Sequence, residues 1–510
     1  MLPMSDVVDL SRLQFAITAL YHFLFVPLTL GLSVLLAIME TVYVMTGKPI
    51  WRDMVKYWGT LFGINFVLGV ATGLTMEFEF GTNWAYYSHY VGDIFGAPLA
   101  IEGLMAFFLE ATFVGLFFFG WNKLTKVQHM CTTWLLALGT NFSALWILIA
   151  NGWMQNPVGA IFNYQTMRME VDNFAKVIFN PVAQAKFVHT ISAGYVTGAM
   201  FVLAVSAYFM LRRRNIAFAQ RSMAVAISFG LASALSVAVL GDESGYLANR
   251  DQKMKIAAME AMWHTEHAPA GLTLFGIPNE VTQHTDYAIK IPYVLGLIAT
   301  RSLHESLPGV NELIEEGKDK IRQGMLAYAA LTTLRTSPAD LDARRTFDHY
   351  QSSLGYGLLL KKYTERVIDA TEEQINLAAH DLKPAVTPLF FSFRIMVACA
   401  LWFITLFACG FYLLLKRRLH THRWYLIAAL CSLPLPWVAA ELGWVVAEYG
   451  RQPWIVHGIL PTFMGSSSLH LEQVIISLSG FILFYSVLAM IEVYLMVKYI
   501  RLGPDRYLLS

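Results

Sequence analysis

Side chains that can bind iron or carry protons recur inside or beside the long apolar stretches of this 510-residue sequence. Burying an ionisable side chain in hydrocarbon costs about 2.5–3.5 kcal/mol, so a chain that keeps several is expected to use them. Imidazole, thioether and carboxylate groups are ligands for iron, and buried carboxylates also relay protons. The residue types therefore predict a metal site or a proton site within a membrane. The residues are His22, Glu102, Glu110, His189, Met396 and Glu448.

A histidine and a methionine are the axial ligands of low-spin electron-transfer haems, whereas an iron with one protein ligand stays open to oxygen. His189 with Met396 fits the first kind of haem. Arg394, two residues before Met396, either neutralises a haem propionate or extends to the membrane interface, and its residue type favours neither. A lone histidine in an apolar helix is more often a hydrogen-bonded core residue, so the prediction rests on the whole set.

Two carboxylates share one apolar stretch. Glu102 and Glu110 are eight residues apart, so in a helix their side chains differ by about 80° in azimuth and about 12 Å in depth. A buried carboxylate stays protonated unless a charge compensates it, and this property suits a proton relay. Ser143 and Asn141 in the next stretch either extend such a path or are ordinary helix-packing residues. We expect Glu102, Glu110 and Ser143 to form a proton path.

The surroundings of Glu448 add a possible charge partner and an aromatic residue. Gly450 and Pro453 end the helix that carries Glu448. Arg451 offers a charge partner for Glu448, for a haem propionate or for both. An interfacial aromatic belt would explain Trp444 but not the buried glutamate. We therefore expect both the arginine and the tryptophan to line the iron site.

Lys255 and Glu260 are five residues apart, just after the sixth apolar stretch. Such a pair can hydrogen-bond and deprotonate a quinol hydroxyl. On residue types alone, a solvated charged surface is the more common role for two such side chains. Both interpretations stay open at this stage.

Positioning these side chains requires a membrane-spanning bundle. The chain has 56% apolar residues, 14% charged residues and a mean hydropathy of +0.49, values beyond those of a soluble domain. Its net charge of +1 gives no reason to expect a nucleic-acid partner. Runs of roughly twenty apolar residues predict an all-α integral membrane protein with nine transmembrane helices. The runs are 15–44, 59–80, 96–119, 130–150, 187–211, 222–241, 389–415, 425–447 and 471–497.

Lysine and arginine are concentrated in alternate loops, and by the positive-inside rule these loops are cytoplasmic. The N-terminus is therefore expected outside and the C-terminus in the cytoplasm. The chain divides into helices 1–6 at 1–240, a long polar outer loop at 241–388, and helices 7–9 with a cytoplasmic tail at 389–510. The basic residues of these loops and the tail are Lys48, Arg52, Lys56, Lys123, Lys126, Arg212, Arg213, Arg214, Arg221, Lys416, Arg417, Arg418, Arg423, Lys498, Arg501 and Arg506.

The topology also gives each candidate ligand a depth, since a helix rises about 1.5 Å per residue. His22 lies about 10 Å below the outer surface, and Met396 lies about 12 Å into the seventh helix. His189 and Glu448 fall at the outer ends of the fifth and eighth helices. Four potential ligands from four helices thus lie in the outer half of the membrane, which favours an iron site over four separate core residues.

Several longer motifs match one family, and together they extend over essentially the whole chain. The chain resembles subunit I of the cytochrome bd ubiquinol oxidases, and its long 241–388 loop is similar to that of the proteobacterial type. The motifs are Leu20–Thr29, Gly69–Phe78, Gly92–Glu102, Phe107–Glu110, Gly241–Tyr246 and Gly450–Trp454.

The resemblance implies a low-spin haem b, a high-spin haem b and haem d. Carried over by position, His189 and Met396 are the ligands of the low-spin haem b iron, with Arg394 as electrostatic support. His22 is assigned to the haem d iron and Glu448 to the high-spin haem b iron, two roles that relatives can exchange.

The same resemblance implies roles for the remaining residues. Lys255 with Glu260 forms the quinol site in the external loop. Glu102 lies beside haem d, and Glu110 belongs to the proton path, with Ser143 and Asn151 nearby. One departure from the family pattern affects this path, because Ala111 stands where close relatives are expected to have serine.

The implied reaction oxidises ubiquinol or menaquinol at the periplasmic face and reduces O2 to water with cytoplasmic protons, so proton motive force arises without a pump. The implied setting is the lipid bilayer of the bacterial inner membrane, in a complex with a second large membrane subunit and a small single-helix subunit. From the residues alone the alternative is a proton- or ion-coupled transporter without redox chemistry. Inverted repeats or paired broken helices would favour the transporter, and neither is evident in the sequence.

Overall fold

The computed structural model describes residues 4–505, so Arg506 lies outside the described residues. Within this range nine helical segments are long and apolar enough to cross a membrane, which confirms the expected fold class. The segments comprise α1 (Met4–His22) with α2 (Val26–Thr46), α3 (Pro49–Thr82), α4 (Ala85–Ile101) with a π-helical turn (Glu102–Phe107) and α5 (Phe108–Phe119), α6 (Lys126–Gln155), α7 (Phe174–Ile178) with α8 (Pro181–Leu211), α9 (Ile216–Asp251), α16 (Val386–Leu415), α17 (Arg423–Cys431) with α18 (Leu435–Glu448), and α20 (Leu471–Leu502).

Most of these helices extend beyond the apolar runs that predict them. The sixth run, 222–241, lies within a helix that continues to Asp251, and the second run, 59–80, lies within a helix that begins at Pro49. An apolar run marks only the part of a helix that crosses hydrocarbon, and polar residues continue the same hydrogen-bonding pattern outside it. The boundary expected at 240/241 therefore falls inside α9, and that at 388/389 falls inside α16.

The first membrane segment is broken next to His22. Pro27 lacks an N–H, and its ring excludes the carbonyl of the residue four positions earlier, so α1 ends at His22 and α2 begins at Val26. At the break, two backbone carbonyl oxygens accept hydrogen bonds from side chains of neighbouring helices. Asn65 Nδ2 donates to the backbone oxygen of Phe25 at 2.8 Å, and Trp437 Nε1 donates to that of Leu24 at 2.7 Å. The histidine is thus held at a fixed interruption of the bundle.

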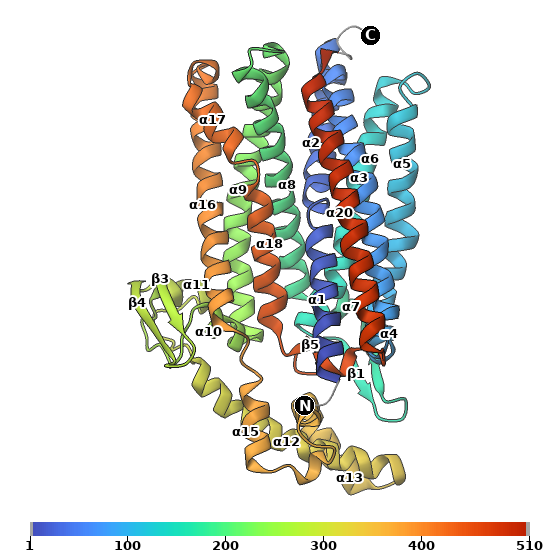
Figure 1. Cartoon of the computed structure of the whole chain (residues 1–510), viewed down its shortest axis with the longest axis vertical. Coiled ribbons are helices and arrows are strands. Elements are labelled where there is room, and N and C mark those ends of the chain that lie inside the picture. The colour runs from blue at the N-terminus through green and yellow to red at the C-terminus, as the bar shows by residue number, and fades with distance from the viewer. Residues whose placement is uncertain (1–3, 506–510) are drawn as a thin grey trace.

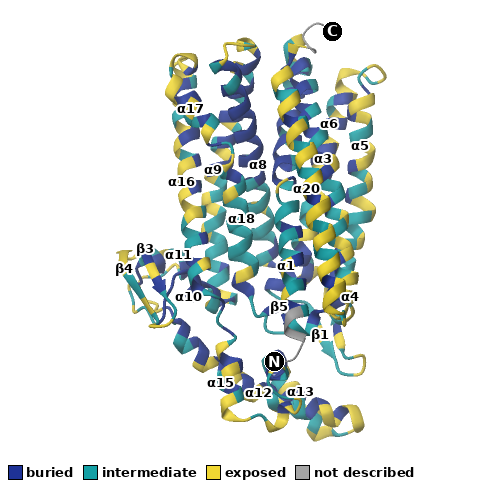
Figure 2. Ribbon diagram, in the orientation of Figure 1, coloured by how far each residue is buried: buried dark blue, intermediate teal, exposed yellow. Residues whose placement is uncertain are grey.

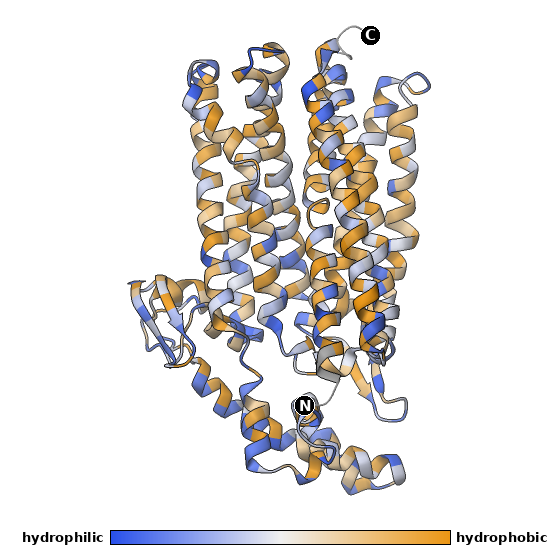
Figure 3. Ribbon diagram, in the orientation of Figure 1, coloured by the Kyte–Doolittle hydropathy of each residue, from blue (hydrophilic) through white to orange (hydrophobic). Residues whose placement is uncertain are grey.

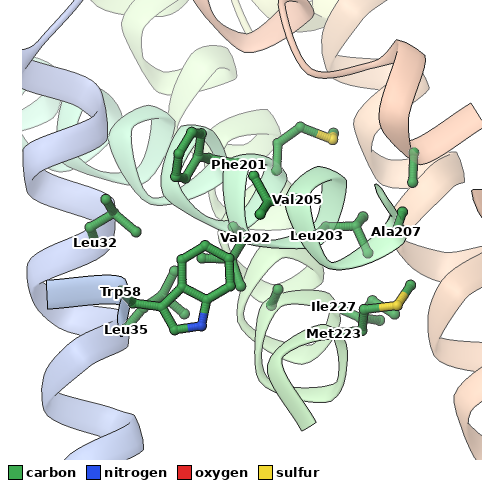
Figure 4. Packing of buried hydrophobic residues seen from close by; sticks show 14 of the residues in the cluster. Leu32, Leu35, Trp58, Phe201, Val202, Leu203, Val205, Ala207, Met223 and Ile227 are labelled. Atoms are coloured by element: carbon green, nitrogen blue, oxygen red, sulfur yellow. The ribbon is translucent and has the colours of Figure 1, made fainter. Parts of the chain in front are cut away.

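Of the nine segments, the one with α8 is the most buried and α20 is the least buried, as Figure 2 shows by the exposed residues along α20. The chain is also drawn in Figure 1. The apolar window of the α8 segment is 83% buried, against 11% for α20. Gly31 of α2 and Gly198 of α8 allow the two backbones to meet, because a Cβ on Gly31 would lie 2.6 Å from the Cα of Gly198. Figure 4 shows the apolar packing of this region, in which Leu32, Leu35, Trp58, Phe201, Val202, Leu203, Val205, Ala207, Met223 and Ile227 are labelled.

Residues 252–385 form an insertion between α9 and α16 at the end of the bundle where the N-terminus lies (Figure 1). Its apolar core joins Ile256, Leu313 and Ile375 to Leu389 at the start of α16. Figure 3 shows hydrophilic residues along this insertion and apolar residues along most of the bundle. Its main elements are α10 (Lys253–Met259), β3 (Leu272–Asn279), β4 (His284–Ile291), α11 (Val294–Ala299), α12 (Val310–Thr336), α13 (Leu341–Tyr350), α14 (Leu354–Leu358) and α15 (Glu372–His380).

Strands β3 and β4 pair antiparallel as a hairpin. Short segments between other helices complete the same end of the molecule. They are the hairpin β1 (Ala160–Asn163) and β2 (Arg168–Val171), the strands β5 (Trp454–Val456) and β6 (Leu460–Pro461), and α19 (Thr462–Gly465).

Candidate functional site

One continuous cavity of about 1500 Å³ runs between the membrane helices and reaches the insertion. It exceeds the roughly 300–1,000 Å³ of a pocket for one small molecule. Its wall contains every site residue predicted from the sequence. These are His22, Glu102, Glu110, Ser143, His189, Lys255, Glu260, Arg394, Met396, Trp444, Glu448 and Arg451.

His22 faces this cavity from the end of α1. Its Nδ1 atom and the Thr72 hydroxyl of α3 are 2.8 Å apart, so the hydroxyl orients the ring. A Cβ on Gly73, the next residue of α3, would lie 3.1 Å from His22 Cε1. The ring is therefore fixed by a hydrogen bond and packed against bare backbone, as a ligand that must keep one orientation requires.

His189 and Met396 line the cavity from α8 and α16. The Nδ1 atom of His189 is buried, and the backbone of Val237 lies within hydrogen-bonding reach of the imidazole. Each side chain faces a glycine, because a Cβ on Gly241 would lie 3.5 Å from His189 Cε1 and one on Gly443 would lie 3.2 Å from Met396 Sδ. The imidazole and the thioether thus border one space, and these two groups form the axial pair of a low-spin haem iron.

Glu448 is surrounded by hydrogen-bond donors from three helical segments. Arg451 Nη2 donates to Glu448 Oε2 at 2.5 Å, and Asn151 Nδ2 donates to Oε1 at 3.0 Å. Gln155 Nε2 and Lys186 Nζ approach the same Oε1 at 3.2 and 3.5 Å. Glu448 is therefore an oriented carboxylate beside two cationic side chains, Lys186 and Arg451.

Sequence reasoning missed Lys186 and Gln155 in this cluster. The signal for Lys186 was present, since it lies three residues before His189 at the end of an apolar run. The Arg451 Nε and Nη1 atoms are buried and have no acceptor among the described residues. An arginine with unused buried donors beside a lysine fits an anionic group of a cofactor, such as a haem propionate.

Lys255 lies on α10 and joins the same cluster. Its Nζ donates to Gln155 Oε1 at 2.8 Å and to the backbone oxygen of Ala447 at 3.0 Å. Burial and the nearby positive charge of Lys186 lower the pKa of the Lys255 ammonium well below its usual range. A lysine in this state can lose its proton far more readily than a solvated one.

Glu260 has a different partner, so the structure does not pair it with Lys255. Arg394 Nη2 donates to Glu260 Oε2 at 2.7 Å, while its Nη1 donates to the backbone oxygen of Met259 at 2.5 Å. Arg394 Nε and Nη2 also donate to the backbone oxygen of Thr273 at 3.1 and 2.6 Å. Because all three guanidinium nitrogens are engaged in this way, Arg394 secures the insertion, and it can act on a haem only through its charge.

The carboxyl of Glu260 is 1% exposed, and this burial raises its pKa, although the guanidinium of Arg394 opposes the shift. A carboxylate with a raised pKa takes up a proton more readily than a solvated one. Lys255 and Glu260 thus lie on one cavity wall with different partners, and the pKa of each is shifted by burial.

Glu102 begins a π-helical turn, Glu102–Phe107, and Glu110 lies in α5, which follows this turn. The azimuth of about 80° expected between them assumes a continuous α-helix, so it does not apply here. The Ser143 hydroxyl donates to Glu102 Oε1 at 2.6 Å. Glu110 is 7% exposed and packs on Gly139, where a Cβ would lie 3.0 Å from Glu110 Cγ. Asn141, which lies on α6 with Ser143, forms no hydrogen bond with either glutamate within the described residues. Its Oδ1 atom accepts a hydrogen bond from the Tyr195 hydroxyl at 2.7 Å.

The sequence is similar to one family of proteins over almost its whole length. Residues 10–504 match the family described as cytochrome bd terminal oxidase subunit I. The chain is 52% identical over 502 residues to cytochrome bd-II ubiquinol oxidase subunit 1 of Escherichia coli strain K12, covering 98% of each chain. It is 34% identical over 503 residues to cytochrome bd ubiquinol oxidase subunit 1 of Bacillus subtilis strain 168, covering 98% of this chain and 95% of the relative.

The fold also resembles that of a solved protein. A chain of the bd oxidase from Geobacillus thermodenitrificans superposes with a TM-score of 0.78 at 22% sequence identity, over 99% of this chain and 100% of that one. At this sequence identity the similarity supports the arrangement of the helices alone.

Proposed function

Since this chain belongs to the cytochrome bd terminal oxidase subunit I family, we propose how its own residues bind haem and quinol and conduct protons. The chain is the haem-containing subunit of a terminal quinol oxidase, a quinol:O2 oxidoreductase, in the bacterial inner membrane, which it crosses many times. The observation that carries the proposal is one cavity whose wall holds all the candidate iron ligands together with Lys255 and Glu260.

The residues of the cavity fit haem. His189 and Met396 would bind the iron of a low-spin haem b, since an imidazole and a thioether form its axial pair. His22 would bind the iron of haem d, and Glu448 that of a high-spin haem b. Arg451 and Lys186 would neutralise propionates, with Trp444 packed beside them. When bound, the haems supply the one-electron steps between quinol and oxygen.

Quinol is proposed to bind where the insertion meets the cavity. Glu260 accepts a proton from a quinol hydroxyl, and Arg394 holds the carboxylate in place. Lys255, with its lowered pKa, accepts the second proton or hydrogen-bonds the second oxygen of the ring. These protons leave at the outer surface.

Protons for oxygen reduction are proposed to come from the cytoplasm. Glu110 takes up the proton and passes it to Glu102, which the Ser143 hydroxyl orients. Ala111 contributes no hydroxyl to this path, so water or Ser143 completes the connection. Proton release outside and uptake inside separate charge without a pump.

The sidedness follows from the basic residues. In the structure the N-terminus and the insertion share one end of the bundle, and the C-terminus lies at the other (Figure 1). The loops rich in arginine, 212–214 and 416–418, favour a cytoplasmic C-terminus and a periplasmic N-terminus. The insertion then faces the periplasm and is the proposed quinol-binding loop. It separates the two proposed membrane domains, 1–240 and 389–510.

The chain works in a complex with other subunits. We propose that these are a second large membrane subunit and a small single-helix subunit, and that the donor is ubiquinol or menaquinol. The alternative function, a proton- or ion-coupled transporter, is not supported, because the relatives described above are oxidase subunits. Oxygen consumption by the purified complex on addition of quinol tests the activity directly, and a complex that takes up no oxygen with any quinol would refute it.

The proposed quinol site can be tested by substituting Glu260. Glu260→Gln should lower the rate at limiting quinol by about 100-fold, the loss of one general base, with the haem spectrum unchanged. Because the pKa of Glu260 is raised, its base form grows as pH rises through that pKa, so the wild-type rate increases over this range. The increase should vanish in the variant.

The matched control is Glu305→Gln, an exposed glutamate of the same insertion, which should behave as wild type in both measurements. A Glu260→Gln enzyme with the wild-type rate and pH profile would remove Glu260 from the quinol site.

A further inference from the structure

The β3–β4 hairpin carries an exposed apolar surface that the proposed chemistry does not use. Phe275 of β3 pairs with Ile289 of β4, and Ile291, two residues further along, points to the same side. Next to them lie Ile277 and Tyr287. The exposed fractions are 50% for Phe275, 47% for Ile277, 81% for Tyr287, 58% for Ile289 and 40% for Ile291. A contiguous surface of this kind on a small element marks an interaction site.

The hairpin lies beside the end of the membrane helices. Arg394, which donates to the backbone oxygen of Thr273 in β3, is five residues past the start of the apolar run at 389, or about 8 Å into it. Leu274 and Phe275 also line the same cavity as Arg394 and Met396, so the exposed apolar surface borders this cavity at Phe275. Figure 1 shows the hairpin beside the ends of α9 and α16, whereas α12 and α13 lie beyond the bundle.

Two charged side chains of the hairpin region, Glu280 and Lys290, form ion pairs with the rest of the insertion. Lys290 Nζ and Glu266 Oε2 are 2.6 Å apart, and Lys383 Nζ and Glu280 Oε2 are 2.7 Å apart. Burial favours a raised pKa for Glu280, but hydrogen bonds from Lys383 and two backbone N–H groups outweigh it and lower the pKa. The Lys383–Glu280 pair therefore persists at neutral pH. Exposed apolar and aromatic residues beside paired charges are typical of elements in the membrane interface.

We propose that the β3–β4 hairpin lies in the outer leaflet of the bilayer, with its exposed apolar surface at the boundary between headgroups and acyl chains. Its contact with the cavity wall then offers a quinol dissolved in the leaflet a path to Glu260 and Arg394 that avoids water. The position of the hairpin in the membrane is inferred from the structure and does not depend on the proposed function. The quinol path rests on the function proposed above.

Spin labelling of the complete complex in lipid nanodiscs tests the membrane position. Ile289→Cys and Ile277→Cys are made in a background in which Cys131, Cys399, Cys409 and Cys431 are alanine. Leu341→Cys on α13, where the side chain is 68% exposed, is the matched control. Nitroxides at both hairpin positions should collide more with oxygen, which concentrates in lipid, than with a water-soluble nickel complex, and the Leu341 nitroxide should show the reverse.

Two results would overturn the membrane position. Hairpin nitroxides that collide with nickel as strongly as the control would place this surface in water. Nitroxides shielded from both reagents would place it against another protein subunit.

The quinol path has a separate test. Ile289→Lys should raise KM for quinol by about tenfold, equivalent to ~1.4 kcal/mol, with kcat and the haem spectrum unchanged, and Leu341→Lys should change neither constant. An unchanged KM would refute the path while leaving the membrane position intact. If the proposed quinol oxidation itself is wrong, the wild-type complex shows no quinol-dependent oxygen uptake in the same assay, which distinguishes the two failures.

Discussion

Met396→Leu is expected to convert the low-spin haem to a high-spin form. Leucine is close to methionine in volume, so the contact of residue 396 with Gly443 and the packing of α16 on α18 should survive. It offers no sulfur lone pair, so the iron would keep only His189. The reduced spectrum should lose its low-spin component. Quinol-driven oxygen uptake should fall at least by the roughly 10–100-fold that loss of a supporting residue of a metal site causes.

The control for this variant is Met490→Leu. Met490 is on α20 with its side chain 64% exposed, away from the cavity, so its spectrum and activity should match wild type. A Met396→Leu protein with an unchanged reduced spectrum would exclude Met396 as a ligand and with it the assignment of the low-spin site.

Glu110→Gln is expected to slow oxygen reduction by about 100-fold, the low end of what proton transfer by a positioned side chain contributes. Glutamine preserves the shape that packs on Gly139 but cannot carry a proton through the cycle. Because Glu110 is no haem ligand in this account, the haems should remain bound with unaltered spectra. Rapid mixing of the reduced complex with oxygen measures the affected step apart from quinol oxidation.

Glu492→Gln supplies the comparison, since Glu492 is a carboxylate of α20 that does not line the cavity. It should leave oxygen reduction unchanged. Wild-type turnover in Glu110→Gln would refute the proton role, and loss of haem in that variant would make Glu110 a structural residue instead.

The number of helices and the depth of the candidate ligands could be predicted because both follow from local sequence. Apolar length decides which segments enter hydrocarbon, and the depth of a residue follows from the helical rise. His22, His189, Met396 and Glu448 were identified in this way, and the structure places all four on one cavity. The resemblance then added roles that the residue types left open.

The helix ends and interruptions were harder to predict. Apolar runs do not report where polar residues continue a helix, as α9 does to Asp251. Pro27 does signal a break, but the donors that stabilise it, Asn65 and Trp437, come from distant parts of the chain. The π-helical turn at Glu102 has no comparable signal in its composition, and it changes the direction of one carboxylate relative to the other.

Side-chain partners across the bundle were the least predictable feature. Lys255 and Glu260 are neighbours in sequence, yet one bonds Gln155 and the other bonds Arg394. Which partner each finds depends on how α6, α10 and α16 pack, and spacing along one segment does not contain that information. The same holds for Lys186, whose contact with Glu448 joins α8 to α18.

We propose that His22, His189, Met396 and Glu448 hold haem iron in one cavity. The reduced-minus-oxidised spectrum of the purified complex, taken with the extracted haem content, is the most direct test of these ligands. The spectrum should show a low-spin haem b, a high-spin haem b and haem d, and His189→Ala should abolish the low-spin signal. A colourless preparation, or a spectrum that His189→Ala leaves unchanged, would refute the proposed ligands.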